Sequence, residues 1–301
     1  MFINKTSLII PTRERINNLN RLFHSIRNIS SKFNEILIID SSSNETNKKL
    51  SSIFSKYKNV KVIRSIPSTS KQRNIGINKY NKKNIFLMFC DDDILFHKKS
   101  FKNMDIFINK YPNYAGYGFN LIEKENKFFE NIKKNKFIKY FGFYDNRPGI
   151  VCDNGWHTKI SNIHKDCKTM WLSTQACIYQ TKYVNKNNLF DTDLGEYSYL
   201  EDLIFSFGIG ERGLMGLSKN SKYKHPNNIE RTNVEFGIKE VINRHKFVKK
   251  NNLNLLKFYI SISLKSLFVL SKILLLRAHF IPKLIGNIIG IIICLTGLKR
   301  K

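Results

Sequence analysis

Four short apolar runs in the first ninety residues restrict the fold of this chain more than any other feature. Each reads as a buried strand, and the segments between them carry apolar residues at helical spacing. Alternation of this kind predicts a largely parallel sheet that is covered by helices on both faces. The predicted strands are "SLIIP" (7–11), "NEILIIDSSS" (34–43), "VKVIRS" (60–65) and "NIFLMFC" (84–90).

In such a sheet ligands bind at the carboxyl ends of the strands, so the residues at these ends are candidates for a site. The first strand is followed by Pro11, Thr12 and Arg13, the second ends in Asp40 with three serines, and the third ends at Ser65. All these ends, together with that of the fourth strand, are expected to face one rim of the sheet.

The fourth strand ends in Asp91, Asp92 and Asp93, although the chain has 51 Lys and Arg against 23 Asp and Glu. Adjacent carboxylates suit a hard divalent cation, Mg²⁺ or Mn²⁺, which takes oxygen ligands and shares them with a diphosphate. Such a cation would neutralise charge on a departing phosphate. The other interpretation, acids that stabilise a helix N-terminus, explains one such residue but not three.

Two further positions near these ends suit a nucleotide. Asp40 can accept hydrogen bonds from a base or ribose; its other interpretation, a helix N-cap, is a role that Ser43 or Asn44 could fill instead. Arg73 and Asn74 stand early in a predicted helix, where the helix dipole and a guanidinium both favour phosphate.

Glu201 and Asp202 open a predicted helix that follows a loop. A carboxylate in this position can act as a general base and take the proton from an attacking hydroxyl. Acids at a helix N-terminus also stabilise the helix itself, and the residues alone leave both interpretations open.

Composition limits the function classes. With 301 residues, of which 42% are apolar, the chain can bury a core, and this argues against disorder. A net charge of +28 could serve to bind nucleic acid, an anionic membrane surface or an anionic substrate, or it could reflect a genomic bias toward Lys. The lysines are scattered rather than gathered in a stripe, and nucleic acid is the least favoured of these interpretations. Five Cys without a CxxC pair, and an apolar stretch before Pro11 too short for a signal peptide, predict a reducing cytoplasm.

Residues 125–170, rich in Lys and aromatic side chains, give no predicted elements and read as an insertion. Trp156 and Trp171 could stack on sugar rings or pack in the core. Two Cys and two His could form a zinc site, although their spacing fits no common zinc pattern: Cys152, His157, His164 and Cys167.

The C-terminal segments 253–280 and 281–301 are strongly apolar, but no uninterrupted run reaches the roughly 20 residues of a spanning helix. Helices in a membrane interface, or a shallow hairpin split at Pro282, would satisfy both the apolar residues and the lysines, which would meet anionic headgroups. Ordinary helices packed on the protein's own core are the alternative. The lysines are Lys257, Lys265, Lys272 and Lys283.

Six motifs, in this order and spacing, resemble the family 2 glycosyltransferases with the GT-A fold, over about residues 5 to 230. The resemblance implies inverting transfer of a sugar from a nucleotide-sugar donor, with Mn²⁺ or Mg²⁺ bound by a DXD motif. It also implies a Rossmann-like, mostly parallel central sheet flanked by helices. The motifs are "SLIIPTRER", "ILIIDSSS", "SKQRNIGI", "FLMFCDDDIL", "FDTDLGEYSYLEDLIFSF" and "KYKHP".

The resemblance implies a role for individual residues. Asp91 and Asp93 would form the DXD motif, with Asp93 nearer the metal, and His225 would be a further contact to the metal or the diphosphate. Asp92 would contact ribose or sugar, and Asp202 would be the catalytic base. The other residues that it implies for substrate binding are Pro11, Thr12, Arg13, Asp40, Arg73, Asn74 and Glu201.

The chain also departs from the family pattern. The Gly that usually follows the Asp of the second strand is absent, which puts contacts to the nucleotide base there in doubt. The QxxRW motif of processive synthases is also absent, and this favours the addition of one sugar per encounter. Acceptor choice is expected in 125–170. The predicted division has three parts. Residues 1–124 bind the nucleotide-sugar, residues 125–250 bind the acceptor and carry the catalytic base, and residues 251–301 form an apolar, basic helical tail that is expected to associate with a membrane.

The sequence therefore predicts a cytoplasmic glycosyltransferase on the inner face of a bacterial membrane, acting in cell-surface glycan synthesis. Its donor would be a UDP-, GDP- or dTDP-sugar, its acceptor a glycan or lipid-linked glycan, and nucleic acid would not be a partner. A sugar nucleotidylyltransferase is an alternative, although "PTRERINN" lacks the expected Gly-rich loop. Outside the enzymes, the composition also fits a basic nucleic-acid-binding protein or a non-catalytic scaffold.

Overall fold

The computed structural model describes residues 1–124, 142–184, 189–195, 198–226, 231–275 and 277–297. The chain forms two compact units, and each is built from two separate segments. Unit 1 comprises Met1–Lys124 and Lys159–Asn227, and unit 2 comprises Glu125–Thr158 and Asn228–Lys301. The sequence analysis divided the chain into three consecutive parts instead; the functions that it assigned to those parts remain predictions.

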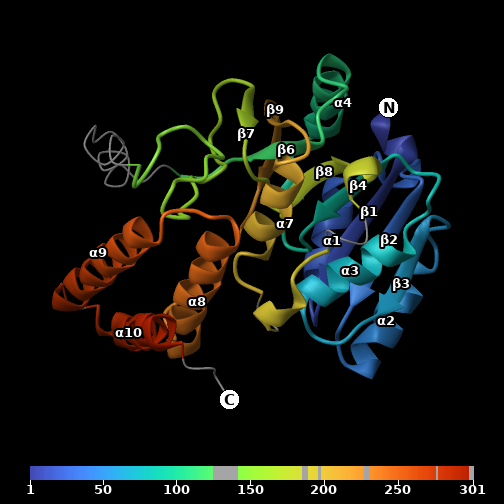
Figure 1. The fold of residues 1–301 in the computed structure, drawn as a ribbon. Helices are drawn as coiled ribbons and strands as arrows, with labels where there is room; N and C mark the ends of the chain where they lie inside the picture. Colours follow the sequence, from blue (N-terminus) through green and yellow to red (C-terminus); the bar gives the residue numbers. More distant parts are fainter. Residues whose placement is uncertain (125–141, 185–188, 196–197, 227–230, 276, 298–301) are drawn as a thin grey trace. The chain divides into compact units, whose positions relative to one another are not determined.

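The described strands of unit 1 form one nine-stranded sheet with the order β3-β2-β1-β4-β8-β6-β9-β5, in which β7 also pairs with β9 (Figure 1). The first four strands in this order are parallel, as predicted, whereas β8 runs antiparallel to both β4 and β6. The strands are β1 (Thr6–Thr12), β2 (Glu35–Asp40), β3 (Val60–Arg64), β4 (Phe86–Cys90), β5 (Leu95–Phe96), β6 (Gly116–Leu121), β7 (Cys167–Thr169), β8 (Ala176–Gln180) and β9 (Met215–Lys224).

Helices cover both faces of the parallel strands. Successive residues of a strand point to opposite faces of the sheet, and in β1, β2 and β4 the residues on both faces are buried. Leu8 and Ile38 belong to one core cluster with apolar residues of α1, α2 and α4. On the other face, Ile9 contacts α3 so closely that a Cβ on Gly76 would meet its side chain, and Phe89 packs on the ring of Phe205 in α7. The helices are α1 (Ile16–Ser25), α2 (Asn44–Phe54), α3 (Thr69–Lys79), α4 (Ser100–Lys110) and α7 (Glu201–Gly210).

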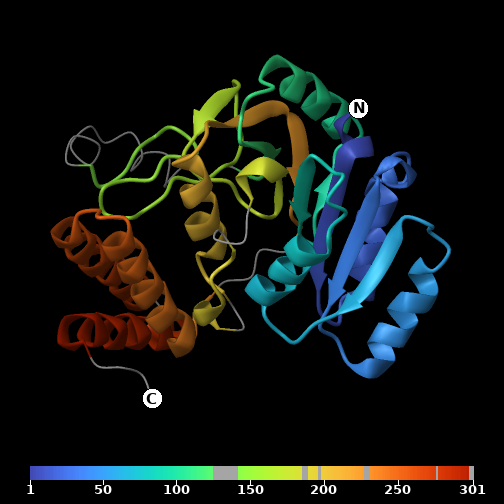
Figure 2. The same ribbon diagram turned by 45° about the vertical axis from the view of Figure 1, so that its right-hand side comes forward.

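The described part of unit 2 contains the helices α8 (Val234–Lys250), α9 (Leu255–Leu274) and α10 (Ile281–Thr296), drawn in orange to red in Figure 2. Its apolar centre includes Val241, Phe258 and Ile262, with Trp156 packed against them. The tail is interrupted between α9, which ends at Leu274, and α10, which begins at Ile281. Pro282, where one of the predicted arrangements placed a split, stands in the first turn of α10, where its missing N–H has no helical partner to lose. The sequence analysis did not predict α8.

α10 approaches α8 through glycines. A Cβ on Gly237 would lie 2.5 Å from the carbonyl oxygen of Lys283, and a Cβ on Gly286 would collide with the carbonyl oxygen of Val234 and lie 3.0 Å from the Cα of Gly237. Each contact is with backbone, which cannot rotate away. The two helix backbones can therefore lie this close only because these residues have no side chain.

Replacing Gly286 with Ala is expected to lower the free energy of unfolding by about 1–3 kcal/mol, because the added methyl group forces α8 and α10 apart. Urea unfolding followed by circular dichroism measures this. Ser263→Ala, on the exposed side of α9, is the control and should change stability by less than about 0.5 kcal/mol. An unchanged midpoint for Gly286→Ala would contradict the close helix contact.

Candidate active site

An acidic loop, Asp91–Asp93, follows β4 at the carboxyl end of the parallel strands. Asp92 is buried at 4% exposure, and its Oδ2 accepts a hydrogen bond of 2.6 Å from the Thr12 hydroxyl at the end of β1. The Arg15 guanidinium, half exposed, lies 3.2 Å from both Asp92 and Asp93. Burial raises the pKa of Asp92 to about 6, against the hydrogen bond from Thr12 and the charge of Arg15.

His225 reaches this loop because β5, which follows the loop directly, pairs with the end of β9. The two strands are antiparallel, and β9 terminates one residue before His225. His225 Nε2 thus lies 3.1 Å from Asp93 Oδ1. Burial acts to raise the pKa of Asp93, but the hydrogen bond and charge of His225 lower it below its ordinary value, and the same hydrogen bond raises the pKa of His225.

Arg73, at 3% exposure, connects the acidic loop to α7. Its Nη2 lies 2.8 Å from Asp91 Oδ1, and its Nη1 is paired with Glu201, whose other oxygen accepts a hydrogen bond of 2.9 Å from Ser70. Burial alone would lower the pKa of this guanidinium, but the Glu201 and Asp91 carboxylates raise it above its ordinary value. Arg73 therefore remains charged and holds two carboxylates from distant parts of the chain.

Asp202 stands beside this pair in the first turn of α7, which begins after Leu200 in a left-handed conformation with φ 73°. One of its oxygens accepts a hydrogen bond of 2.8 Å from the Leu203 amide. Burial raises the pKa of Asp202 to about 6, and the neighbouring Glu201 carboxylate contributes to the shift. A carboxylate with this pKa is ionised at neutral pH and accepts a proton more readily than an exposed Asp.

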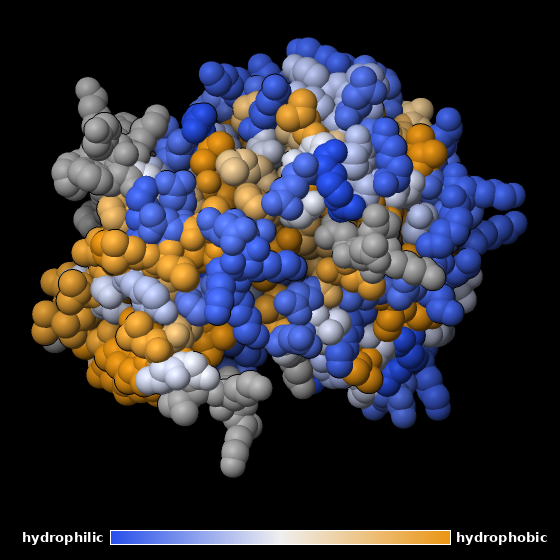
Figure 3. Space-filling model, viewed as in Figure 1, coloured by the Kyte–Doolittle hydropathy of each residue, from blue (hydrophilic) through white to orange (hydrophobic). Residues whose placement is uncertain are grey.

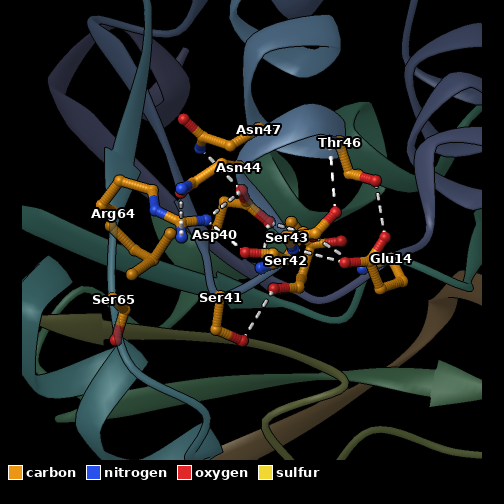
Figure 4. Close-up of polar contacts among 12 residues, drawn as sticks. Glu14, Asp40, Ser41, Ser42, Ser43, Asn44, Thr46, Asn47, Arg64 and Ser65 are labelled. Atoms are coloured by element: carbon orange, nitrogen blue, oxygen red, sulfur yellow. Dashed lines mark hydrogen bonds and ion pairs between the residues drawn. The ribbon is translucent and has the colours of Figure 1, made fainter.

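Asp40 lies at the end of β2 with no exposed surface, within a network of short-range contacts (Figure 4). One oxygen accepts hydrogen bonds from the amide and hydroxyl of Ser42. The other lies 2.6 Å from Asn47 Nδ2 and 3.5 Å from Arg64 Nη1. Ser43, not Asp40, caps α2. Asp40 thus organises its own loop, and both of its carboxylate oxygens already have hydrogen-bond partners.

The profile described as Glycosyl transferase family 2 matches residues 7–172, which is more than half of the chain. The chain belongs to glycosyl transferase family 2. The family segment includes β1 to β4 and the acidic loop, while Glu201, Asp202 and His225 lie beyond the match.

Solved structures confirm the GT-A fold for this family 2 protein. GalNAc-T7, crystallised with UDP, GalNAc and Mn²⁺, is 16% identical with a TM-score of 0.57, over 75% of this chain and 44% of its own. S. aureus TarS 1-349 in complex with UDP-GlcNAc is 15% identical with a TM-score of 0.55, and the match covers 81% of this chain and 66% of the TarS chain. The chain thus spans less than two thirds of the length of either structure. No curated protein sequence matches it.

Among the described residues of this family 2 protein, no group of three or more His, Cys, Asp and Glu side chains is arranged to hold a metal ion. Asp93 and His225 are in contact, but Asp91 is paired with Arg73. The four residues considered for zinc, all of them described, form no such group either. Trp171 is buried at 5% exposure and packs in the core. Trp156 is half-buried, and the Arg244 guanidinium lies 4.1 Å from its ring centroid.

Two predicted phosphate ligands have other contacts. The Asn74 side chain both donates to and accepts from the backbone of Phe190, at 2.8 and 2.9 Å, and so ties α3 to the chain before α7. Arg73 is enclosed by carboxylates, as described above. Arg13 is exposed, and Pro11 lies in β1 opposite Ile39, beyond the residues that pair with β4.

Sequence reasoning missed two residues that shape the site. Arg15 contacts the acidic loop, although Arg13 was the residue predicted from this segment. Gln72 donates to the carbonyl oxygens of Thr12 and Ile39 at 2.9 and 2.7 Å, joining the ends of β1 and β2 to α3. A polar residue next to Arg73 on a helix that covers a sheet was the available signal, because a buried amide needs partners.

Proposed function

We propose that this chain is an inverting glycosyltransferase that moves a sugar from a nucleoside-diphosphate sugar to an acceptor hydroxyl, one sugar per encounter. The observation that carries the proposal is the link through Arg73: one buried guanidinium joins the acidic loop, where a donor diphosphate would lie, to the start of α7, where Asp202 stands. Family membership supports the reaction class.

In the proposed reaction Asp202 is the general base. The acceptor oxygen forms a bond to the anomeric carbon of the donor, its proton passes to the Asp202 carboxylate, and the bond from the anomeric carbon to the diphosphate oxygen breaks. Attack opposite the leaving group inverts the configuration and needs a single base. Glu201 supports the base indirectly, because its negative charge raises the pKa of Asp202.

Two side chains in contact at the acidic loop offer ligand atoms for a divalent cation. Asp93 supplies a carboxylate oxygen and His225 an imidazole nitrogen. Mn²⁺ can bind both atoms, whereas Mg²⁺ prefers the carboxylate oxygen. Asp91 is a further ligand in this proposal, and Asp92 a contact to ribose or sugar. When bound, the cation would stabilise negative charge on the departing diphosphate. The structure of GalNAc-T7 with UDP and Mn²⁺ supports this choice.

The nucleoside would lie at the ends of β1 and β2. We assign its binding to Pro11 and Thr12 at the end of β1, to Arg13, and to Asp40 through displacement of Arg64, whose 3.5 Å contact with Asp40 is longer than the 2.6 Å contact of Asn47. UDP and UDP-GlcNAc in the neighbouring structures support a UDP-sugar ahead of GDP or dTDP. The acceptor would be a glycan or lipid-linked glycan at the cytoplasmic face of a bacterial membrane, in cell-surface glycan synthesis.

Calorimetric titration with UDP, GDP, dTDP and CMP, each with and without Mn²⁺, tests the donor site. We expect one nucleotide to bind only with the metal, and Asp93→Ala to weaken that binding at least about tenfold, because it removes a metal ligand and the partner of His225. Glu235→Ala, a surface carboxylate of unit 2 paired with Lys239, should bind as the unsubstituted protein does.

Absence of nucleotide binding by folded protein under all these conditions would contradict the proposal. Tight, salt-sensitive binding of DNA or RNA would then favour a nucleic-acid-binding protein. Equal binding by Asp93→Ala and unsubstituted protein would remove the acidic loop from the donor site.

A further inference from the structure

The outer faces of α9 and α10 carry a continuous series of exposed apolar side chains. On α9 these recur at intervals of three and four residues, so they lie on one side of the helix. α10 repeats the pattern, and in Figure 3 the apolar surface over both helices forms one orange area. The residues are Leu256, Ile260, Leu264, Leu267, Leu270 and Leu274 on α9, and Ile281, Ile285, Ile288, Ile292 and Leu295 on α10.

The inner faces of the same helices are already used. Phe258, Ile262 and Val269 are the buried residues of α9, and Gly286 and Gly290 are buried on α10 against α8. The exposed apolar residues are therefore not the core of unit 2. A soluble protein rarely leaves an apolar area of this extent uncovered.

Ion pairs hold α10 to its neighbours and oppose a transmembrane orientation. Ala278–Thr296 is the one described helix long and apolar enough to cross a membrane. However, Lys283 of α10 lies 3.3 Å from the buried carboxylate of Glu240 on α8, which Lys265 of α9 also contacts. These lysines outweigh burial and lower the pKa of Glu240 to about 2, so the group is charged. Spanning would carry this charged cluster toward hydrocarbon.

The charge of the segment indicates what covers the apolar faces. Residues 241–301 contain twelve Lys and Arg and neither Asp nor Glu. The lysines on α9 and α10 predicted to meet headgroups are largely engaged within unit 2: Lys265 and Lys283 contact Glu240, and Lys257 contacts Asp153. The exposed cations lie at the helix connections instead, where Lys249, Lys250 and Arg277 flank α9. An apolar face edged by cations suits an anionic bilayer.

We propose that α9 and α10 lie in the plane of an anionic membrane, with their outer apolar faces in the boundary between headgroups and acyl chains and α8 on the aqueous side. The inference rests on the proposed location at a membrane and specifies the surface that contacts it. Attachment of this kind needs no spanning segment, since apolar burial and headgroup attraction act together.

Flotation of the full chain with sealed vesicles tests the attachment. Vesicles of equal parts phosphatidylglycerol and phosphatidylcholine should bind it, phosphatidylcholine alone should bind it more weakly, and high salt should reduce the difference. Leu267→Glu, at a position 60% exposed on α9, should weaken binding by about tenfold or more. Leu214→Glu, 54% exposed on unit 1, is the matched control and should bind as before.

The orientation is tested by Trp substitution at Ile281 and Ile292, which stand eleven residues, or about 16 Å, apart on α10. Quenching by lipids brominated at different depths, corrected for the two native Trp residues, should place both at the same shallow depth. Depths that differ by most of this length would show a spanning helix and overturn the proposal. Circular dichroism establishes that each variant is folded.

Three other results would overturn the attachment: no binding to either vesicle, equal loss in Leu267→Glu and Leu214→Glu, or a dimer in solution that Leu267→Glu dissociates while vesicles bind neither form. Vesicle binding is measured without donor or acceptor, and nucleotide binding without lipid. Failure of one proposal can therefore be told from failure of the other.

Discussion

Asp202→Asn is expected to reduce sugar transfer by about 10²- to 10⁴-fold while metal-dependent nucleotide binding persists, because the amide keeps the shape of the side chain but accepts no proton. Stability should not fall. Burial raises the pKa of Asp202 to about 6, so the folded state favours the neutral form, and a neutral amide removes the cost of an ionised group at neutral pH. Product formation and thermal unfolding, measured on the same preparation, check both points.

The same group sets the expected pH dependence of transfer. A base must be deprotonated to act, so kcat/KM should fall by about tenfold per unit as the pH drops below about 6 and should level off above it. Glu211→Gln, at the other end of α7, is the control for the substitution and should retain both the rate and the profile. An Asp202→Asn enzyme with undiminished transfer would assign the base elsewhere.

Arg73→Leu is expected to lower the free energy of unfolding by about 3–5 kcal/mol, because it leaves the Asp91 and Glu201 carboxylates next to each other without their buried cation. Urea unfolding measures the loss. Adding Glu201→Gln should recover part of it, since one of the two uncompensated charges is then removed.

Arg15→Leu is the matched control for Arg73. Arg15 also contacts two carboxylates, those of Asp92 and Asp93, but its side chain is 47% exposed, so water screens its attraction to them. We expect a loss of less than about 1 kcal/mol. Equal effects of the two substitutions would mean that the buried position of Arg73 has no special importance for the fold.

The parallel half of the sheet could be predicted because its strands are buried on both faces. Such strands are continuous apolar runs, and each of the four predicted runs overlaps one of the observed strands β1 to β4. The acidic loop could be located for the same reason, since a strand end is visible where apolar residues stop at Asp91. Its contact with His225 was indicated only by the family resemblance, because the pairing of β5 with β9 joins residues far apart in the chain.

The partners of the candidate residues could not be predicted. Arg73 and Asn74 were assigned to phosphate because early helix positions favour anions, but tertiary contacts with Glu201 and Phe190 occupy both side chains. Periodicity locates a residue on a helix face without indicating what packs against it. α8 was missed although Val241 and Val248 occupy its buried face at helical spacing, because the stretch is largely polar and its apolar residues are few.

The position of β8 in the sheet has a consequence for how the protein is made. β4 has β8 as its second neighbour, and β6 pairs with β8 and β9, which are synthesised more than fifty residues after β6. While the intervening chain is still emerging from the ribosome, β4 has an open edge of apolar residues and β6 has neither partner. Completion of the sheet must therefore wait for the segment after residue 170, and premature termination before it would release an aggregation-prone fragment.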